Sequence, residues 1–306
     1  MLSSEIASTL GGRFMIVDIY PYSFPEYLAA QGKDKNYLEV LSTKDRAEVV
    51  GMCDQYVKYG AFPELVDIRN KREYLNSIYQ TIYLGDIITR NKITNDFAVR
   101  LILKKIAESV TKPLSFNRLS NILKSAGAVL GKQTVINYVG YMMDSYMLFT
   151  LQNYAAKLVE KETSPKYYFM DTGLLGLMLM DCSSAQLENL VAIELIRRYG
   201  RENVFYFEKN VEIDFYVPEE KLAIQVSLQV LDQIDTRERE IGAFVKLKNF
   251  IGDAKGVVYL SQRNQSTDFP VLTCAVANRN GRYVAVIGAS PYMAEPVWDK
   301  DGILDG

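Results

Sequence analysis

The sequence contains no histidine, three cysteines and one tryptophan among its 306 residues. Without histidine the chain cannot build a Ser-His-Asp or Cys-His catalytic centre, nor a histidine-ligated zinc or iron site. Cys53, Cys182 and Cys274 are odd in number and far apart, which is typical neither of a disulfide framework nor of a cysteine metal site. Any bound metal is therefore expected to be a hard cation on oxygen ligands.

Long apolar runs are also lacking. No stretch reaches the roughly 20 apolar residues of a membrane-spanning helix, and Glu5 stands where a signal peptide needs an apolar core. The hydrophobic content of 48% and the charged content of 24% are those of ordinary globular proteins. The sequence thus predicts a soluble cytoplasmic protein without membrane contact, long enough for two or three domains.

Charge is unevenly distributed along the chain, although the net charge is only -2. Residues 97–162 carry nine cations and four acids, a net charge of +5, and the parts before and after this segment are acidic. A basic segment favours a nucleic acid as partner, and a charge of +5 is a modest signal for it.

The first part of the chain shows mainly helical patterns. Residues 1–10 predict a helix that stops at a Gly-Gly pair, and the apolar run FMIVDIY over residues 14–20 predicts a buried strand. Ser23 and Glu26 have the spacing of a capping box. Three more helices are predicted over residues 23–31, 43–59 and 71–90.

The basic segment predicts a winged helix. Helices are expected over residues 97–109, 115–124 and 132–148, the last two joined by a glycine-containing turn, and an aromatic strand follows at 166–170. The polar residues at the start of the third helix are candidates for contacts with phosphates and base edges: Lys132, Gln133, Thr134 and Asn137. The alternative is a domain used for packing or oligomerisation, as other winged helices are.

Two alternating strands follow at 211–217 and 222–227, joined by a turn of hairpin length. Their period of two places Glu212 and Asp214 on one face of the first strand and Gln225 and Ser227 side by side on the second. The pattern fits either the frame of a metal site or a half-buried hairpin with a solvated polar face. A preceding helix at 184–199 carries acids beside its apolar stripe, and the order of elements is α/β.

Several stretches together resemble bacterial and archaeal AAA+ ATPases that carry a winged helix and a nuclease-like C-terminal domain of largely unassigned function. The stretches are MLSSEIASTLGGRF with IYPYSFPEYL, YGAFPELV, KREYLNSIYQTIYLGDII, KQTVINYVGYMMDSYML, YYFMDTGLL, LENLVAIEL, EIDFYV with IQVS, and TREREIGA. They occur in the order of that family and cover residues 1 to about 260.

The resemblance implies an α/β and α multidomain protein. Its expected parts are a remnant of the AAA+ module with its helical lid (1–96), a winged helix-turn-helix (97–170), a restriction-endonuclease-like α/β domain of the PD-(D/E)XK type (171–270) and a C-terminal extension (271–306). The extension contains a plausible hairpin around residues 278–281 and does not match the family.

The nucleotide-binding half of that family has no counterpart here. A phosphate loop and a magnesium-binding acidic strand precede the MLSSE stretch in the family, and no GxxxxGK[ST] motif occurs in this sequence. The resemblance therefore implies a shortened relative that is not an ATPase by itself. Arg13 resembles an arginine finger, which could serve ATP bound by a full-length AAA+ relative or act within a homo-oligomer. The alternative is an arginine that binds carbonyls at a helix end.

In the nuclease-like domain the resemblance matches Glu188 with the helix acid, Asp214 with the strand acid, Gln225 with the second-strand acid and Ser227 with the lysine. The acids of that superfamily hold Mg²⁺ or Mn²⁺, and its lysine supports the attacking water or the scissile phosphate. Gln225 lacks the charge of a carboxylate and Ser227 that of an amine. Glu188 and Asp214 thus remain candidate ligands for a weakly held metal.

Two functions are expected on this basis. The first is a non-catalytic or weakly catalytic regulatory protein that binds DNA or protein. The second is a Mg²⁺- or Mn²⁺-dependent nuclease with an altered site, in which Glu212 or Glu208 supplies the missing charge.

Overall fold

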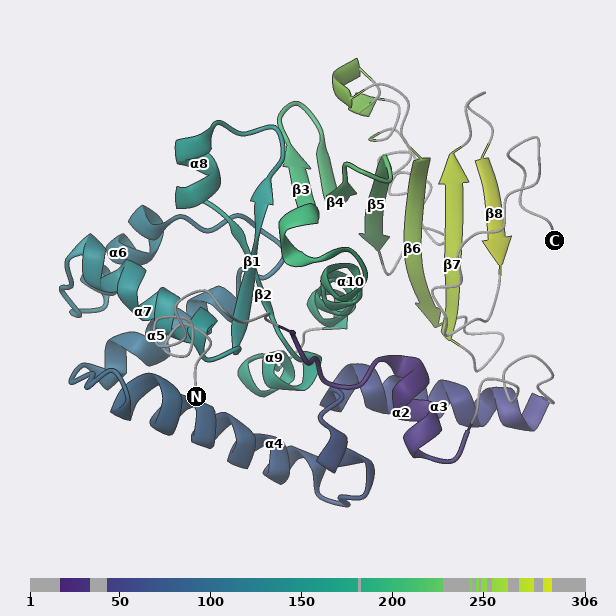
Figure 1. Ribbon diagram of the computed structural model, residues 1–306, viewed down its shortest axis with the longest axis horizontal. Coiled ribbons are helices and arrows are strands. Elements are labelled where there is room, and N and C mark those ends of the chain that lie inside the picture. Colours follow the sequence, from purple (N-terminus) through teal and green to yellow (C-terminus); the bar gives the residue numbers. More distant parts are fainter. Residues whose placement is uncertain are drawn as a thin grey trace.

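A computed structural model describes residues 17–33, 43–180 and 183–227, parts of 243–251 and three strands between 255 and 287, the strands by their backbone alone. Figure 1 shows a mixed α/β protein in which one sheet runs across the molecule and helices gather around its earlier strands. The predicted helix over residues 1–10 and Arg13 lie outside the described residues. None of the helices in the described part is long and apolar enough to cross a membrane.

The sheet has the strand order β2-β1-β3-β4-β5-β6-β7-β8. Its strands are β1 (Leu148–Asn153), β2 (Lys166–Phe169), β3 (Phe205–Glu208), β4 (Glu212–Val217), β5 (Leu222–Ser227), β6 (Lys255–Arg263), β7 (Pro270–Ala277) and β8 (Tyr283–Ile287). The pairs β1–β3 and β5–β6 are parallel, and the other neighbours are antiparallel. The predicted hairpin of β4 and β5 is confirmed, and β7 and β8 pair on either side of the expected turn, whose residues are not described.

The N-terminal helices agree with the sequence patterns. They are α2 (Phe24–Ala30), α3 (Thr43–Tyr59), η2 (Pro63–Val66), α4 (Lys71–Gln80) and η3 (Thr81–Thr89). The capping box of Ser23 and Glu26 is present in both directions. The predicted helix over 71–90 is continuous but changes at Thr81 from α-helical to wider π-helical turns.

The predicted buried strand over residues 14–20 is wrong in its described part. Residues 17–20 have no regular structure, and Val17 and Ile19 expose 77% and 92% of their surface. Composition suggested a strand, but a strand needs a neighbour, and no described strand pairs with this segment.

The segment expected to form a winged helix contains α5 (Asp96–Ala107), α6 (Phe116–Ser125), α7 (Lys132–Asp144) and the antiparallel pair β1–β2, with α8 (Leu158–Thr163) in between. Helix α7 ends earlier than predicted because Tyr146 takes a positive φ of 55° and the chain enters β1 at Leu148. Strand β1 also pairs with β3, so the sheet and the hydrophobic core continue across the expected domain boundary at residue 170.

The remaining helices, α9 (Thr172–Met178), α10 (Ser183–Tyr199) and the short η4 (Arg201–Asn203), connect β2 to β3. Helix α10 packs against β2 and β5 (Figure 1). The side-chain amide of Asn189 donates to the carbonyl of Phe169 and accepts from its N–H, at 2.8 and 2.7 Å. Asn189 thereby satisfies backbone groups at the edge of β2 as a neighbouring strand would.

A buried carboxylate joins the N-terminal helices to this region. Asp171 accepts hydrogen bonds from the N–H groups of Ala61 at 2.8 Å, Gly173 at 2.8 Å and Leu174 at 3.3 Å. We call these four residues the Asp171 anchor. Gly60, at φ 75°, has no room for a side chain, since a Cβ there would lie 1.9 Å from the Asp171 carboxylate. The anchor therefore ties the end of α3 to the start of α9.

Candidate functional site: a buried lysine among three carboxylates

The site begins where β4 and β5 separate. Backbone pairing of the two strands ends at Phe215 and Ile224. Beyond that point the N–H of Asp214 donates to Gln225 Oε1 at 2.7 Å, and the N–H of Val226 donates to Asp214 Oδ2 at 2.8 Å. Two side chains thus replace the ladder bonds that the diverging strands lose. The structure brings Asp214 and Gln225 together as predicted, but the Gln225 side-chain oxygen accepts a hydrogen bond from a backbone N–H.

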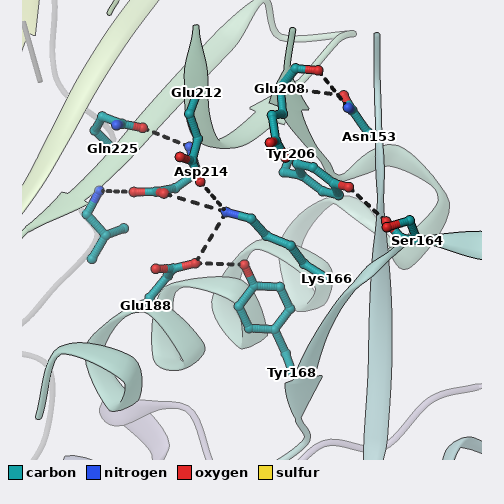
Figure 2. Close-up of polar contacts among 11 residues, drawn as sticks. Asn153, Ser164, Lys166, Tyr168, Glu188, Tyr206, Glu208, Glu212, Asp214 and Gln225 are labelled. Atoms are coloured by element: carbon teal, nitrogen blue, oxygen red, sulfur yellow. Dashed lines mark hydrogen bonds and ion pairs between the residues drawn. The ribbon is translucent and has the colours of Figure 1, made fainter. Parts of the chain in front are cut away.

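The cation of the site comes from a strand that sequence analysis did not connect with it. Lys166, the first residue of β2, is fully buried, and its Nζ lies 3.3 Å from Glu212 Oε1 and 3.8 Å from both Glu188 Oε1 and Asp214 Oδ1. Figure 2 shows the ammonium between these three side chains. We call Lys166, Glu188, Glu212 and Asp214 the carboxylate–lysine centre. Its members come from β2, α10 and β4.

Tyr168 completes the contacts of Glu188. Its hydroxyl donates to Glu188 Oε1 at 2.8 Å, and both groups are buried (Figure 2). Lys166 and Tyr168 are two residues apart on β2, so the strand period places both side chains on the same face. Glu188 lies in the second turn of α10, whose packing against β2 holds the carboxylate in place.

The electrostatics of the centre follow from burial. Desolvation, together with the charge of Asp214, raises the pKa of Glu188 to about 8, against the opposing effects of Lys166 and of the Tyr168 hydrogen bond. For Lys166 desolvation lowers the pKa, but the three carboxylates outweigh it and leave the pKa above its ordinary value. The lysine therefore stays charged, while the buried glutamate holds a proton more tightly than an exposed one.

The centre opens to solvent on the side of β3 and β4. The Glu212 side chain is 53% exposed, whereas that of Asp214 is 14% exposed. Glu208 lies nearby, and desolvation, assisted by the charge of Glu212, raises its pKa. The Lys166 Nζ also lies 5.3 Å from the centroid of the buried Tyr206 ring, a cation–π contact. An approaching ligand would therefore meet negative charge first.

The candidate metal ligands Glu188 and Asp214 are close together, but a cation already lies between them. Hard oxygen donors of this kind suit Mg²⁺ or Mn²⁺. Yet no group of three or more His, Cys, Asp or Glu side chains with the arrangement of a metal site occurs in the described part of the chain. A divalent cation would have to displace the Lys166 ammonium, which lies within 4 Å of both carboxylates.

The remaining predicted nuclease-like residue, Ser227, is described by its backbone, which pairs with Leu260 of β6. Its side chain lies outside the described residues. The sequence has no amine at position 227, but folding places the amine of Lys166 beside Glu188 and Asp214. A signal for it existed: Lys166 opens the strand KYYF, and all four of its residues are buried. A lysine in such a strand needs an opposite charge beside it.

The candidate nucleic-acid-binding residues lie on the surface of the helix-turn-helix. Lys132, Gln133 and Asn137 are exposed and Thr134 is partly exposed at the start of α7, where Gln133 Nε2 donates to Asn137 Oδ1 at 3.1 Å. Helices α6 and α7 together contain three cations, Arg118, Lys124 and Lys132, and one acid, Asp144 at the last position of α7. The outer face of α6 forms an open hollow whose lining includes Arg118, Asn121 and the apolar Ile122.

Comparison with known proteins gives relatives without an assigned activity. Residues 51–185 match the profile of a domain of unknown function, DUF8612. The chain is 32% identical over 253 residues to an uncharacterized protein of Methanocaldococcus jannaschii, covering 80% of this chain and 56% of the relative. It is 28% identical over 239 residues to an uncharacterized protein of Haemophilus influenzae, covering 75% of this chain and 57% of the relative. No solved structure matches.

These matches cover only part of each relative and only part of the site. The chain spans 56% and 57% of the length of the two relatives, so each is considerably longer than the matched part. The DUF8612 region contains α7, Lys166 and Tyr168, together with the whole Asp171 anchor, whereas Glu188, Glu212 and Asp214 follow it in the sequence. The carboxylate–lysine centre therefore combines residues from within and beyond this region.

Proposed function

We propose that this chain is a regulatory protein of AAA+ ATPase ancestry that binds duplex DNA through its winged helix, and whose nuclease-like centre has little or no hydrolytic activity. The observation that carries the proposal is the surface of α6 and α7. Three cations and exposed amide side chains lie there on a helix-turn-helix, and the only acid of the two helices is at the far end of α7. Such a surface suits contacts with phosphates and with base edges in the major groove.

The geometry of the carboxylate–lysine centre argues against efficient hydrolysis. Gln225 directs its carbonyl oxygen to the backbone N–H of Asp214, and the Lys166 ammonium lies between the candidate metal ligands. The exposed carboxylate of Glu212 lies on the side open to solvent, where it repels an approaching phosphate. The centre is therefore better suited to holding β2, β4 and α10 together than to binding a phosphodiester.

Salt-dependent binding of a labelled duplex tests this function. Fluorescence anisotropy should give an affinity that falls steeply with salt, because binding releases counterions. Lys132→Ala should weaken binding and reduce the salt slope by about 1, as expected for the loss of one phosphate contact. Lys209→Ala, which removes an exposed lysine from the turn between β3 and β4, is the matched control and should bind like the unmodified protein. Absence of a salt-dependent signal at low ionic strength would exclude DNA binding.

One observation favours a second function, a Mg²⁺- or Mn²⁺-dependent nuclease. Lys166 supplies beside Glu188 and Asp214 the positive charge that is lacking at Ser227. If the ammonium moved aside, the two carboxylates could hold the metal, which would activate the attacking water, and Lys166 would stabilise the charge on the phosphate. Cleavage of plasmid DNA that requires Mg²⁺ or Mn²⁺ and is abolished by Asp214→Ala would establish it. Cleavage that persists in the variant would indicate a contaminating enzyme.

A further inference from the structure

The carboxylate–lysine centre is joined to the helix-turn-helix by a short series of direct contacts. Residue Pro165 immediately precedes Lys166, and its carbonyl accepts a hydrogen bond from the N–H of Leu114 at 3.0 Å. Leu114 is fully buried and immediately precedes Ser115, the N-cap of α6. The Ser115 hydroxyl in turn accepts from the N–H of Arg118 at 3.2 Å. Lys166 and Arg118 are far apart in sequence, but only Pro165, Leu114 and Ser115 lie between them along this path of contacts.

The segment around Lys166 is held from several sides. Tyr206, whose ring lies under the Lys166 ammonium, donates its hydroxyl to the carbonyl of Ser164 at 2.9 Å (Figure 2). Two residues further along β2, the Tyr168 hydroxyl donates a hydrogen bond to Glu188. Lys166 itself has no exposed surface and reaches three carboxylates on two other elements. Its charge therefore fixes where the start of β2 lies relative to α10 and β4.

Movement at the start of β2 cannot leave α6 unchanged. The Pro165 carbonyl accepts its hydrogen bond from Leu114, in the loop between α5 and α6 and one residue before the N-cap of α6. Leu114 also packs in the same hydrophobic core as Tyr167 and Phe169 of β2. Packed cores transmit such shifts because they have few voids to absorb them. A change in the anchoring of Lys166 therefore reaches α6 and the position of Arg118.

We propose that Lys166 is a positioning residue for nucleic-acid binding: its ionic contacts with Glu188, Glu212 and Asp214 set the placement of α6, and so couple the state of the buried centre to duplex affinity. This inference rests on the proposed DNA binding by α6 and α7. It gives the centre a regulatory role in place of a hydrolytic one. Coupling between two sites is reciprocal, so a bound duplex must also stabilise the contacts of Lys166.

The experiment compares two ways of loosening the same strand. Lys166→Met removes the charge and keeps most of the side-chain volume, whereas Asn189→Ala removes the two hydrogen bonds to Phe169 at the other end of β2 without altering the centre's charge. Lys166→Met is expected to weaken duplex binding by about fivefold or more. Lys166→Arg should restore part of the affinity, and Asn189→Ala should bind within about twofold of the unmodified protein.

Glu188→Gln gives the test a variant that does not depend on a folded Lys166→Met protein. It replaces the ionisable carboxyl beside the ammonium by a neutral amide and keeps an oxygen for the Tyr168 hydroxyl, so its affinity should move in the same direction by a smaller factor. Hydrogen exchange of the full chain gives the reciprocal readout: adding duplex should slow exchange of the Leu114 amide and of the residues of β2.

The outcomes separate the two proposals. If the unmodified protein binds no duplex, DNA binding fails and the coupling fails with it. If Lys132→Ala weakens binding, while folded Lys166→Met and Glu188→Gln bind like the unmodified protein, only the coupling is refuted. Equal weakening by Lys166→Met and Asn189→Ala would also refute it, because the effect would then be a general loosening of β2. Selective weakening by the charge variants, with duplex-dependent protection of Leu114, supports it.

Discussion

Lys166 and Asp171 are both buried charged residues, five positions apart, and the protein satisfies their charges by different means. Lys166 is surrounded by the side chains of three carboxylates from two other elements. Asp171 is surrounded by three backbone N–H groups, one from the end of α3 and two from its own helix. The lysine's partners can be changed by substitution or protonation, whereas backbone donors are always present. The first arrangement can respond to its surroundings, and the second is a fixed structural connection.

The largest effect on stability is expected at Lys166. Lys166→Met would leave buried carboxylates without their cation, and the free energy of unfolding should fall by about 3–5 kcal/mol. Urea denaturation followed by circular dichroism measures it, with Lys132→Met as the control for an exposed lysine. Adding Glu188→Gln to Lys166→Met should recover part of the loss, because the variant no longer buries an ionisable carboxyl beside Asp214. A loss below about 1 kcal/mol would mean that water reaches the centre.

A somewhat smaller loss is expected at the Asp171 anchor. Asp171→Ala would leave three N–H groups without their acceptor, and the free energy of unfolding should fall by about 3 kcal/mol. The exposed Asp144→Ala variant is the control. Gly60→Ala should be similarly harmful, because its Cβ would overlap the Asp171 carboxylate at a positive φ. The two losses should not add in the double variant, since both break the same contact.

The two buried groups should also differ in their response to acid. Burial raises the pKa of Asp171 to about 6 from an ordinary value of 3.8, although the N–H groups of Ala61, Gly173 and Leu174 oppose the shift. The folded state thus binds this proton more tightly than the unfolded state. The residue's contribution to stability rises as the pH falls from above 6 towards 4, and is lost as the pH rises again, by about 2–3 kcal/mol.

Comparison with Asp171→Asn isolates this contribution from other acids, Glu188 among them. Urea denaturation between pH 4.5 and 7.5 measures the free energy of unfolding of both proteins. The stability of the unmodified protein relative to the variant should be greater at pH 4.5 than at pH 7.5. A difference that stays constant with pH would show that Asp171 keeps one protonation state throughout this range.

The smallest effect on stability is expected at the proposed DNA-binding surface of α6 and α7. Lys132 is exposed at the first residue of α7, so Lys132→Ala should change the free energy of unfolding by less than about 0.5 kcal/mol. The same change should weaken duplex binding. Loss of affinity without loss of stability would distinguish this surface from the buried centre, where Lys166→Met should reduce both.

Local sequence patterns predicted most of the helices and the hairpin at the site. Helix α3 coincides with the predicted range 43–59, and the capping box at Ser23 is present. These features depend on contacts between residues close in sequence, so periodicity and capping residues carry the information. Alternation likewise placed Asp214 and Gln225 on neighbouring strands, and the structure joins them by a hydrogen bond.

The failures have a common cause. The segment at 14–20 has the composition of a buried strand, but Val17 and Ile19 are exposed, because a strand depends on a partner that composition does not reveal. Lys166 was overlooked because 22 positions separate it from Glu188 and 48 from Asp214, and no spacing rule connects β2 to β4 across two intervening strands.

The amino-acid order alone excluded catalytic centres and metal sites that need histidine, and it indicated polar and basic residues at the start of the helix at 132–148. Those conclusions rest on composition and on periods of two or 3.6 residues, which hold wherever the segment lies. The pairing of Lys166 with three distant acids arose only from folding, which joins the β1–β2 pair to the larger sheet and packs α10 against β2 and β5. Burial then turned an unremarkable lysine into the charge around which the site is built, since a cation removed from water requires anions beside it.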